Sequence, residues 1–233
     1  MLLSSLRDEV LEANLELVHR GLVLYTFGNV SGMARADGLV VIKPSGVPYE
    51  KLRAEALVVT DLQGKIVEGS LRPSSDLDTH LVLYRTFPHI GGITHTHSEF
   101  ATAWAQARRP IPCFGTTHAD YFHGEVPVTE PLTADEIATD YEENTGKVIC
   151  RALACGDAAG IPAILVAGHG PFTWGATSTE AAHNAVILEA VARMAYYTLR
   201  LSVHASPLGR ELHDKHYLRK HGSGAYYGQA TGS

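Results

Sequence analysis

The chain is poor in cysteine, in positive charge and in long apolar runs, and each shortage excludes a class of protein. Its three cysteines, Cys113, Cys150 and Cys155, are odd in number and lack a framework spacing, so they are expected to be reduced thiols of a cytoplasmic protein. The net charge of −6 argues against a nucleic-acid-binding surface. No apolar run approaches about 20 residues, and the N-terminus has no signal-peptide pattern, so neither a membrane span nor secretion is expected.

What remains is an ordinary globular composition. The 233 residues are 45% hydrophobic and 19% charged, which is enough for one large domain with a substantial core. A net negative charge still permits a small anionic substrate in a local basic pocket.

The pattern of apolar residues and the helix-capping residues predict the helices and strands. Helices are expected from a capping box at 5–8 to a stop at Gly21, and over 76–87, 99–107, 133–146 with a break at Gly146, 177–201 and 211–220. Strands are expected over 23–26, 39–43, 57–60, 65–67, 90–95 and 163–166, with loops over 28–32 and 110–120. Hairpins mixed with helix-separated strands predict a three-layer α/β/α domain with a mixed sheet.

His95-Thr96-His97 closes the apolar strand that starts at Ile90. Because side chains alternate along a strand, His95 and His97 point to the same side and can bind one divalent metal. A hydrogen-bonded pair of histidines at a strand end explains this motif alone equally well. Asp76 and His169 also stand at boundaries of regular elements, and imidazole and carboxylate ligands suit zinc or manganese.

Three turns of small residues, Gly28-Asn29, Ser45-Gly46 and Ser74-Ser75, adjoin regular elements. Glycine permits close backbone approach, and Ser74-Ser75 precedes a helix whose free amides favour an anion. With Lys43 as a point charge, the turns are a candidate phosphate cradle, although each by itself is also ordinary turn chemistry. Periodicity does not place the loop carboxylate Asp120 or the tail residue Tyr227 in any site.

The combined pattern resembles the class II aldolase/adducin family. The motifs that carry the resemblance are Gly28-Asn29-Val30-Ser31, Lys43-Pro44-Ser45-Gly46, Pro73-Ser74-Ser75-Asp76, His95-Thr96-His97 and Gly168-His169-Gly170. Two further segments, 115–121 and 215–229, are similar to the branch of that family that interconverts L-ribulose 5-phosphate and D-xylulose 5-phosphate.

The resemblance implies a role for each matching residue. It implies a mostly antiparallel sheet and a metal site of Asp76, His95, His97 and His169, holding zinc or else manganese or another divalent ion. The matching substrate and phosphate positions are Gly28, Asn29, Lys43, Ser45, Gly46, Ser74 and Ser75, with His216 and Arg219 as accessory residues. Asp120 and Tyr227 match an acid–base pair that a neighbouring subunit of a homotetramer contributes. The implied domain spans 1–229, followed by an inert extension over 230–233.

Four other functions stay open. A related pentulose-phosphate 4-epimerase of another pathway would carry nearly the same residues. An aldolase of the same family would release the two sugar fragments, although its usual Glu at position 76 is Asp here. A Schiff-base aldolase acting through Lys43 would need no metal and would leave the three histidines unexplained. An adducin-like structural module would not need to keep the four metal ligands.

Overall fold

The computed structural model describes residues 1–153 and 160–226, so Tyr227 and the predicted extension 230–233 lie outside the described residues. The helices are α1 (Ser4–His19), α2 (Leu77–Thr86), α3 (Glu99–Gln106), α4 (Thr116–Ala119), α5 (Ala134–Ala138), α6 (Tyr141–Leu153), α7 (Ser178–Leu201) and α8 (Arg210–His221). The strands are β1 (Asn29–Ala34), β2 (Leu39–Ile42), β3 (Val58–Asp61), β4 (Ile66–Glu68), β5 (Gly92–His95), β6 (Ala163–Leu165) and β7 (Pro171–Gly175).

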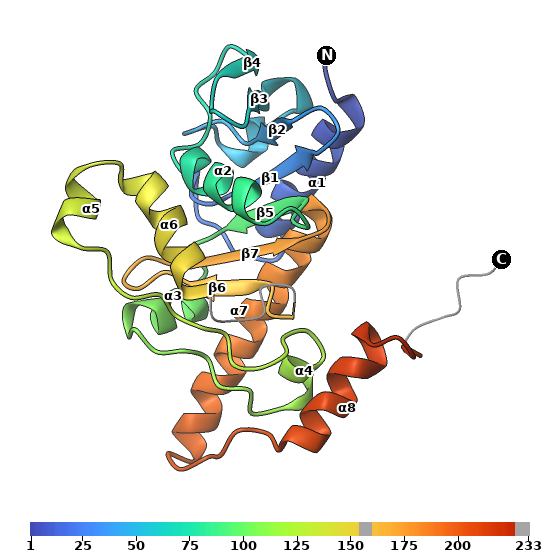
Figure 1. Cartoon of the computed structure of the whole chain (residues 1–233), viewed down its shortest axis with the longest axis vertical. Helices are drawn as coiled ribbons and strands as arrows, with labels where there is room; N and C mark the ends of the chain where they lie inside the picture. Colours follow the sequence, from blue (N-terminus) through green and yellow to red (C-terminus); the bar gives the residue numbers. More distant parts are fainter. Residues whose placement is uncertain (154–159, 227–233) are drawn as a thin grey trace.

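The seven strands form one sheet in the order β4-β3-β2-β1-β5-β7-β6 (Figure 1). Each pairing between neighbouring strands is antiparallel. Within 1–153 and 160–226, parallel pairing is limited to an isolated bridge between Val128 and Leu165. The expected α/β fold with a mostly antiparallel sheet is therefore confirmed.

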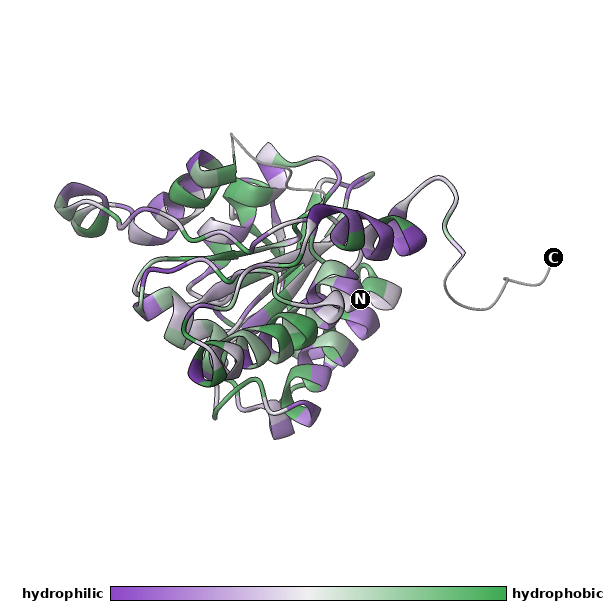
Figure 2. Cartoon of the chain, turned by 90° about the horizontal axis from the view of Figure 1, so that it is seen from below, coloured by the Kyte–Doolittle hydropathy of each residue, from purple (hydrophilic) through white to green (hydrophobic). Residues whose placement is uncertain are grey.

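Helices cover both faces of this sheet (Figure 2). Helices α2 and α6 pack on each other and on one face, where Leu81, Ile149 and Trp174 belong to one buried apolar cluster. Helices α1 and α7 pack on the opposite face through small residues such as Ala13 and Ala185. The result is the predicted three-layer arrangement, and no helix among the described residues is both long enough and apolar enough to cross a bilayer.

Strand β1 corrects the sequence prediction. The strand expected at 23–26 is wrong, and the segment expected as a loop at 28–32 is largely strand. The polar and small residues of β1 are typical of a turn rather than a strand. Gly32 is required in this strand because a Cβ there would lie 2.5 Å from the Ser178 hydroxyl and 2.8 Å from Val10. Close packing of α1 and α7 on β1 thus selected residues that look like a turn.

Four smaller expectations also differ. Helix α1 begins without the side-chain bond of a capping box, and α4 lies inside the loop expected at 110–120. Strand β7 was not expected, because its bounding Pro171 and Gly175 resemble turn residues. The break expected at Gly146 falls instead between α5 and α6, and α6 continues through Gly146 because a Cβ there would lie 2.6 Å from the Val82 Cβ on α2.

Candidate active site

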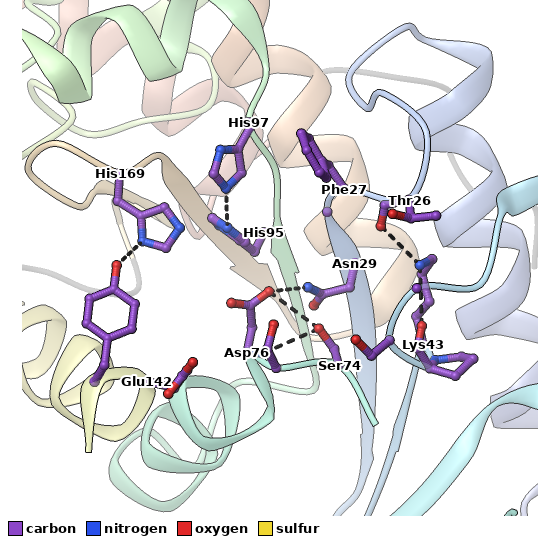
Figure 3. A pocket seen from close by; sticks show the side chains of 16 residues that line it. Thr26, Phe27, Asn29, Lys43, Ser74, Asp76, His95, His97, Glu142 and His169 are labelled. Carbon is purple, nitrogen blue, oxygen red and sulfur yellow. Dashed lines mark hydrogen bonds between the residues drawn. The ribbon is translucent and has the colours of Figure 1, made fainter. Parts of the chain in front are cut away.

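A cavity of about 420 Å³ opens where β1, α2 and α6 begin and where β2 and β5 end (Figure 3). It brings together all the predicted metal ligands and all three small-residue turns. The lining residues are Thr26, Phe27, Gly28, Asn29, Lys43, Pro44, Ser45, Gly46, Ser74, Ser75, Asp76, His95, His97, Tyr141, Glu142 and His169.

Three histidines form a tight cluster at one end of this cavity. His95 ends β5, His97 follows two residues later, and His169 lies in the turn between β6 and β7. Each offers a ring nitrogen, and these three atoms lie within 4.8 Å of one another. The Nε2 atoms of His95 and His97 are 3.1 Å apart, so the two rings face each other as strand alternation predicts.

The donor set fits a metal ion. The Nδ1–H of His95 donates to the carbonyl oxygen of Pro171 at 2.9 Å, which leaves Nε2 as a lone pair in the neutral ring. Burial lowers the pKa of His169 to about 4 and lowers the pKa of His97, and the neighbouring histidines add to both shifts. Neutral imidazoles are the metal-binding form. Nitrogens bound tetrahedrally to zinc at about 2.0–2.1 Å lie about 3.3 Å apart, close to the observed 3.1 Å.

Asp76 lies in the same cavity but outside that tight cluster. It stands at the N-cap position of α2 without a capping hydrogen bond from its side chain, and the Nδ2 of Asn29 donates to its Oδ2 at 2.7 Å. Burial opposes ionisation of Asp76, but its interactions with His95 and His80 and the bond from Asn29 together hold its pKa below the usual value. Asp76 is thus a charged carboxylate facing the histidines, as a fourth ligand or a substrate contact requires.

The other half of the cavity combines a buried lysine with small-residue turns. Lys43 follows β2 with its side chain 2% exposed, and burial lowers its pKa to about 8. The backbone amide of Ser45 donates to the Arg72 carbonyl, and that of Ser74 donates to the Lys43 carbonyl, so these two bonds join the turns.

Because the amides of Ser45 and Ser74 already donate to backbone carbonyls, they are not available to a phosphate as the sequence predicted. No backbone acceptor is found within the described ranges for the amides of Gly46 and Ser75, and both residues line the cavity. The amides of Gly46 and Ser75, together with the serine hydroxyls, are therefore available to an anion in the cavity.

Five lining residues were not predicted for the site: Thr26, Phe27, Pro44, Tyr141 and Glu142. Two of them, Tyr141 and Glu142, belong to one helix. They begin α6, and the Tyr141 hydroxyl lies 3.3 Å from the Nδ1 of His169. Only the restart of the helix after Thr139 could have placed them, and the expected continuous helix from 133 to 146 hid that restart.

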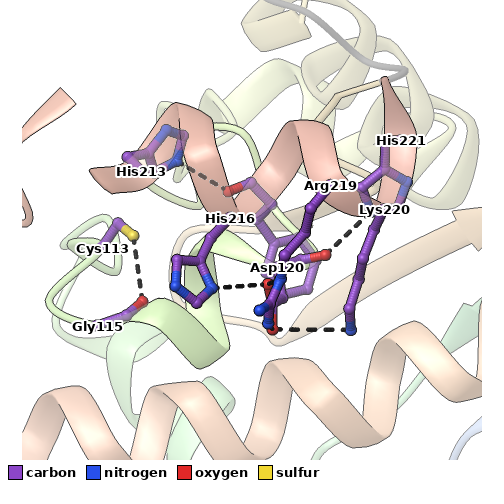
Figure 4. Close-up of polar contacts among 9 residues, drawn as sticks. Cys113, Gly115, Asp120, His213, His216, Arg219, Lys220 and His221 are labelled. Carbon is purple, nitrogen blue, oxygen red and sulfur yellow. Dashed lines mark hydrogen bonds and ion pairs between the residues drawn. The ribbon is translucent and has the colours of Figure 1, made fainter. Parts of the chain in front are cut away.

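Asp120 occupies a separate cluster between α4 and α8 (Figure 4). Its carboxylate accepts hydrogen bonds from Arg219 at 2.8 and 3.1 Å and lies 3.0 Å from the Nδ1 of His216. Burial opposes ionisation of Asp120, but these bonds, together with Lys220, outweigh it and lower its pKa. None of the cavity-lining residues comes from α4 or α8, so Asp120, His216 and Arg219 are brought together within one chain but apart from the histidines.

Comparison with known proteins agrees with this geometry. Residues 8–196 match the family model described as the class II aldolase and adducin N-terminal domain. The chain belongs to the class II aldolase and adducin family. The family explains a metal-type histidine cluster beside an anion cradle, because class II aldolases are typically dependent on a divalent metal.

Solved structures of the family share the whole fold. An L-fuculose 1-phosphate aldolase superposes with a TM-score of 0.78 and 26% identity over 93% of this chain and 96% of its own. YgbL from Klebsiella pneumoniae, for which aldolase, epimerase and decarboxylase activities have been suggested, gives 0.73 and 27% over 91% and 97%. An L-fuculose-1-phosphate aldolase from Thermus thermophilus gives 0.68 and 26% over 87% and 98%.

Proposed function

We propose that this chain is a metal-dependent L-ribulose-5-phosphate 4-epimerase, which interconverts L-ribulose 5-phosphate and D-xylulose 5-phosphate. The observation that supports it best is one cavity with three imidazoles at one end and Lys43 with the amides of Gly46 and Ser75 at the other. A phosphorylated ketose has matching ends, a hydroxyketone and a phosphate.

The chemistry of the substrate selects the route. The hydrogen on carbon 4 is not acidic, because no carbonyl is adjacent to that carbon. Cleavage of the bond between carbons 3 and 4 is easier, since its electrons become an enediolate conjugated with carbon 2. The other fragment is glycolaldehyde phosphate, and re-addition to the opposite face of its aldehyde gives the epimer.

The residues of the cavity divide this work. His95, His97 and His169, with Asp76, would hold the divalent ion, for which zinc is favoured over manganese. When bound, the ion supplies Lewis-acid stabilisation of the charge that develops on the oxygens of carbons 2 and 3. Lys43, Gly46 and Ser75 keep the phosphate anchored while the aldehyde rotates.

Acid–base catalysis needs two further groups, one for each orientation of the carbon 4 oxygen. We assign these roles to Asp120 and Tyr227 of a neighbouring copy in a homotetramer, with His216 and Arg219 beside the substrate. Two observations support this assignment: Asp120 is held ionised by Arg219, and α4 and α8 contribute nothing to the cavity of their own chain.

The second candidate is a class II sugar-phosphate aldolase, and the comparisons support it equally. An aldolase would release glycolaldehyde phosphate into solution, whereas an epimerase would retain it. The deciding experiment incubates the protein with L-ribulose 5-phosphate and measures D-xylulose 5-phosphate and free glycolaldehyde phosphate, with and without a chelator.

Formation of D-xylulose 5-phosphate that a chelator abolishes supports the epimerase. Accumulation of the free aldehyde without the epimer identifies the aldolase instead. Activity that resists chelator and is trapped by borohydride on Lys43 would replace both proposals with Schiff-base chemistry.

A further inference from the structure

A second group of metal-type ligands lies outside the cavity, between α8 and the turn that follows α4. His213 and Asp214 belong to α8, and His123 comes from the turn. The Oδ1 of Asp214 lies 3.1 Å from the Nε2 of His123 and 3.4 Å from the Nδ1 of His213. All three ligand atoms lie within 4.8 Å of one another.

The hydrogen bond of His213 fixes its tautomer. Its Nε2 lies 3.3 Å from the backbone oxygen of Phe122, and because a carbonyl only accepts, Nε2 carries the proton. The other ring nitrogen, Nδ1, lies 3.4 Å from the Oδ1 of Asp214. A histidine with one ring nitrogen held by a backbone carbonyl and the other turned toward a carboxylate has the arrangement of a metal-binding histidine.

The ring of His123 is also held in place. It stacks between His213, at a centroid distance of 5.0 Å, and Tyr217, at 4.5 Å. This stacking directs Nε2 at Asp214 before any ligand arrives, so little conformational entropy is lost on binding. Arg210 lies 3.5 Å from the other carboxylate oxygen, Oδ2, which leaves Oδ1 to the two histidines.

One of the three candidate ligands is buried, and the other two are partly exposed to solvent. The His213 side chain is 11% exposed, whereas those of His123 and Asp214 are 38% and 34% exposed. An ion can therefore enter from solvent and complete its coordination with water, while the buried ligand anchors it.

We propose that His123, His213 and Asp214 bind a second divalent transition-metal ion of the zinc class. The ion would fasten α8 to the turn after α4, because two of its ligands come from the helix and one from the turn. Since α8 also carries the His216 and Arg219 that hold Asp120, the ion would stabilise that cluster without entering it (Figure 4). The inference is independent of the reaction catalysed in the cavity.

The test counts metal ions bound to tag-free protein. Apoprotein is titrated with Zn²⁺ and with Co²⁺, whose visible absorption reports histidine ligation, and bound metal is measured after equilibrium dialysis. Two equivalents per chain are expected for the wild type. His123→Ala and Asp214→Asn should each lose one equivalent, His97→Ala should lose the other, and His19→Ala, an exposed histidine on α1, should lose neither.

Hydrogen exchange supplies a second readout. Zn²⁺ should slow exchange in α8 of the wild type and of His97→Ala, but not of His123→Ala. Far-UV circular dichroism establishes that each variant is folded. A single equivalent in the wild type that His97→Ala abolishes, or two equivalents that His123→Ala and Asp214→Asn both retain, would overturn the second site.

Discussion

Replacing Tyr141 by Phe tests whether the metal centre depends on a residue that the sequence did not reveal. The Tyr141 hydroxyl lies 3.3 Å from the Nδ1 of His169, and its ring stacks near the His169 ring with planes 25° apart. Phenylalanine keeps the ring and removes only the partner that orients the imidazole.

The expected loss follows from that geometry. Removal of a hydrogen-bond partner of a metal-bound histidine typically weakens metal binding by about 10–100-fold. A separation of 3.3 Å is longer than an ideal hydrogen bond, so we expect the lower end of this range, about tenfold, or ~1.4 kcal/mol.

Competition with a chromophoric chelator measures the metal Kd of the wild type, of Tyr141→Phe and of Tyr196→Phe, a half-exposed tyrosine on α7 that serves as control. If metal binding through His169 is correct, only Tyr141→Phe is weakened. A Kd unchanged within about twofold would show that Tyr141 does not orient His169.

Three further results are expected. Because burial lowers the pKa of Lys43 to about 8, its charge is present below that pH and lost above it, so kcat/KM should fall above pH 8, and Lys43→Arg should remove that limb of the profile. Burial raises the pKa of Asp120, but its partners lower it more, so α8 docking is stabilised above the unfolded-state pKa of about 4 and is lost as pH falls through the folded-state value. The hydrogen-exchange protection factors of α8, corrected for intrinsic exchange rates, should therefore fall at acid pH in the wild type and fall less in Asp120→Asn. Gly146→Ala should lower the free energy of unfolding in urea by about 1–3 kcal/mol, because its Cβ would meet Val82, whereas Gly115→Ala, which meets no atom within 4 Å, should change it little; equal values for the two variants would refute the packing argument.

Local sequence signals were sufficient to predict a feature that depends on a single helix, strand or hairpin. Three features were predicted: His95 and His97 on one side at the end of β5, the hairpin of β3 and β4, and the helix that follows Thr177. Periodicity and caps act within a few residues, so each of these features can be predicted locally. Local signals gave the wrong prediction for β1 and for Gly146. The small residues there allow close packing against helices distant in the sequence, and they form neither a turn nor a helix break.

The amino-acid residues specify which chemistry is available: three imidazoles, an aspartate and small-residue turns beside a lysine. Which of these groups meet depends on the packing of elements far apart in the chain. Antiparallel pairing of β5 with β7 sets the Pro171 carbonyl against His95, the start of α6 places Tyr141 on His169, and α8 draws Asp120 into a separate cluster. The reason is that contacts between residues far apart in the chain depend on strand order and helix packing, and no local pattern encodes either one.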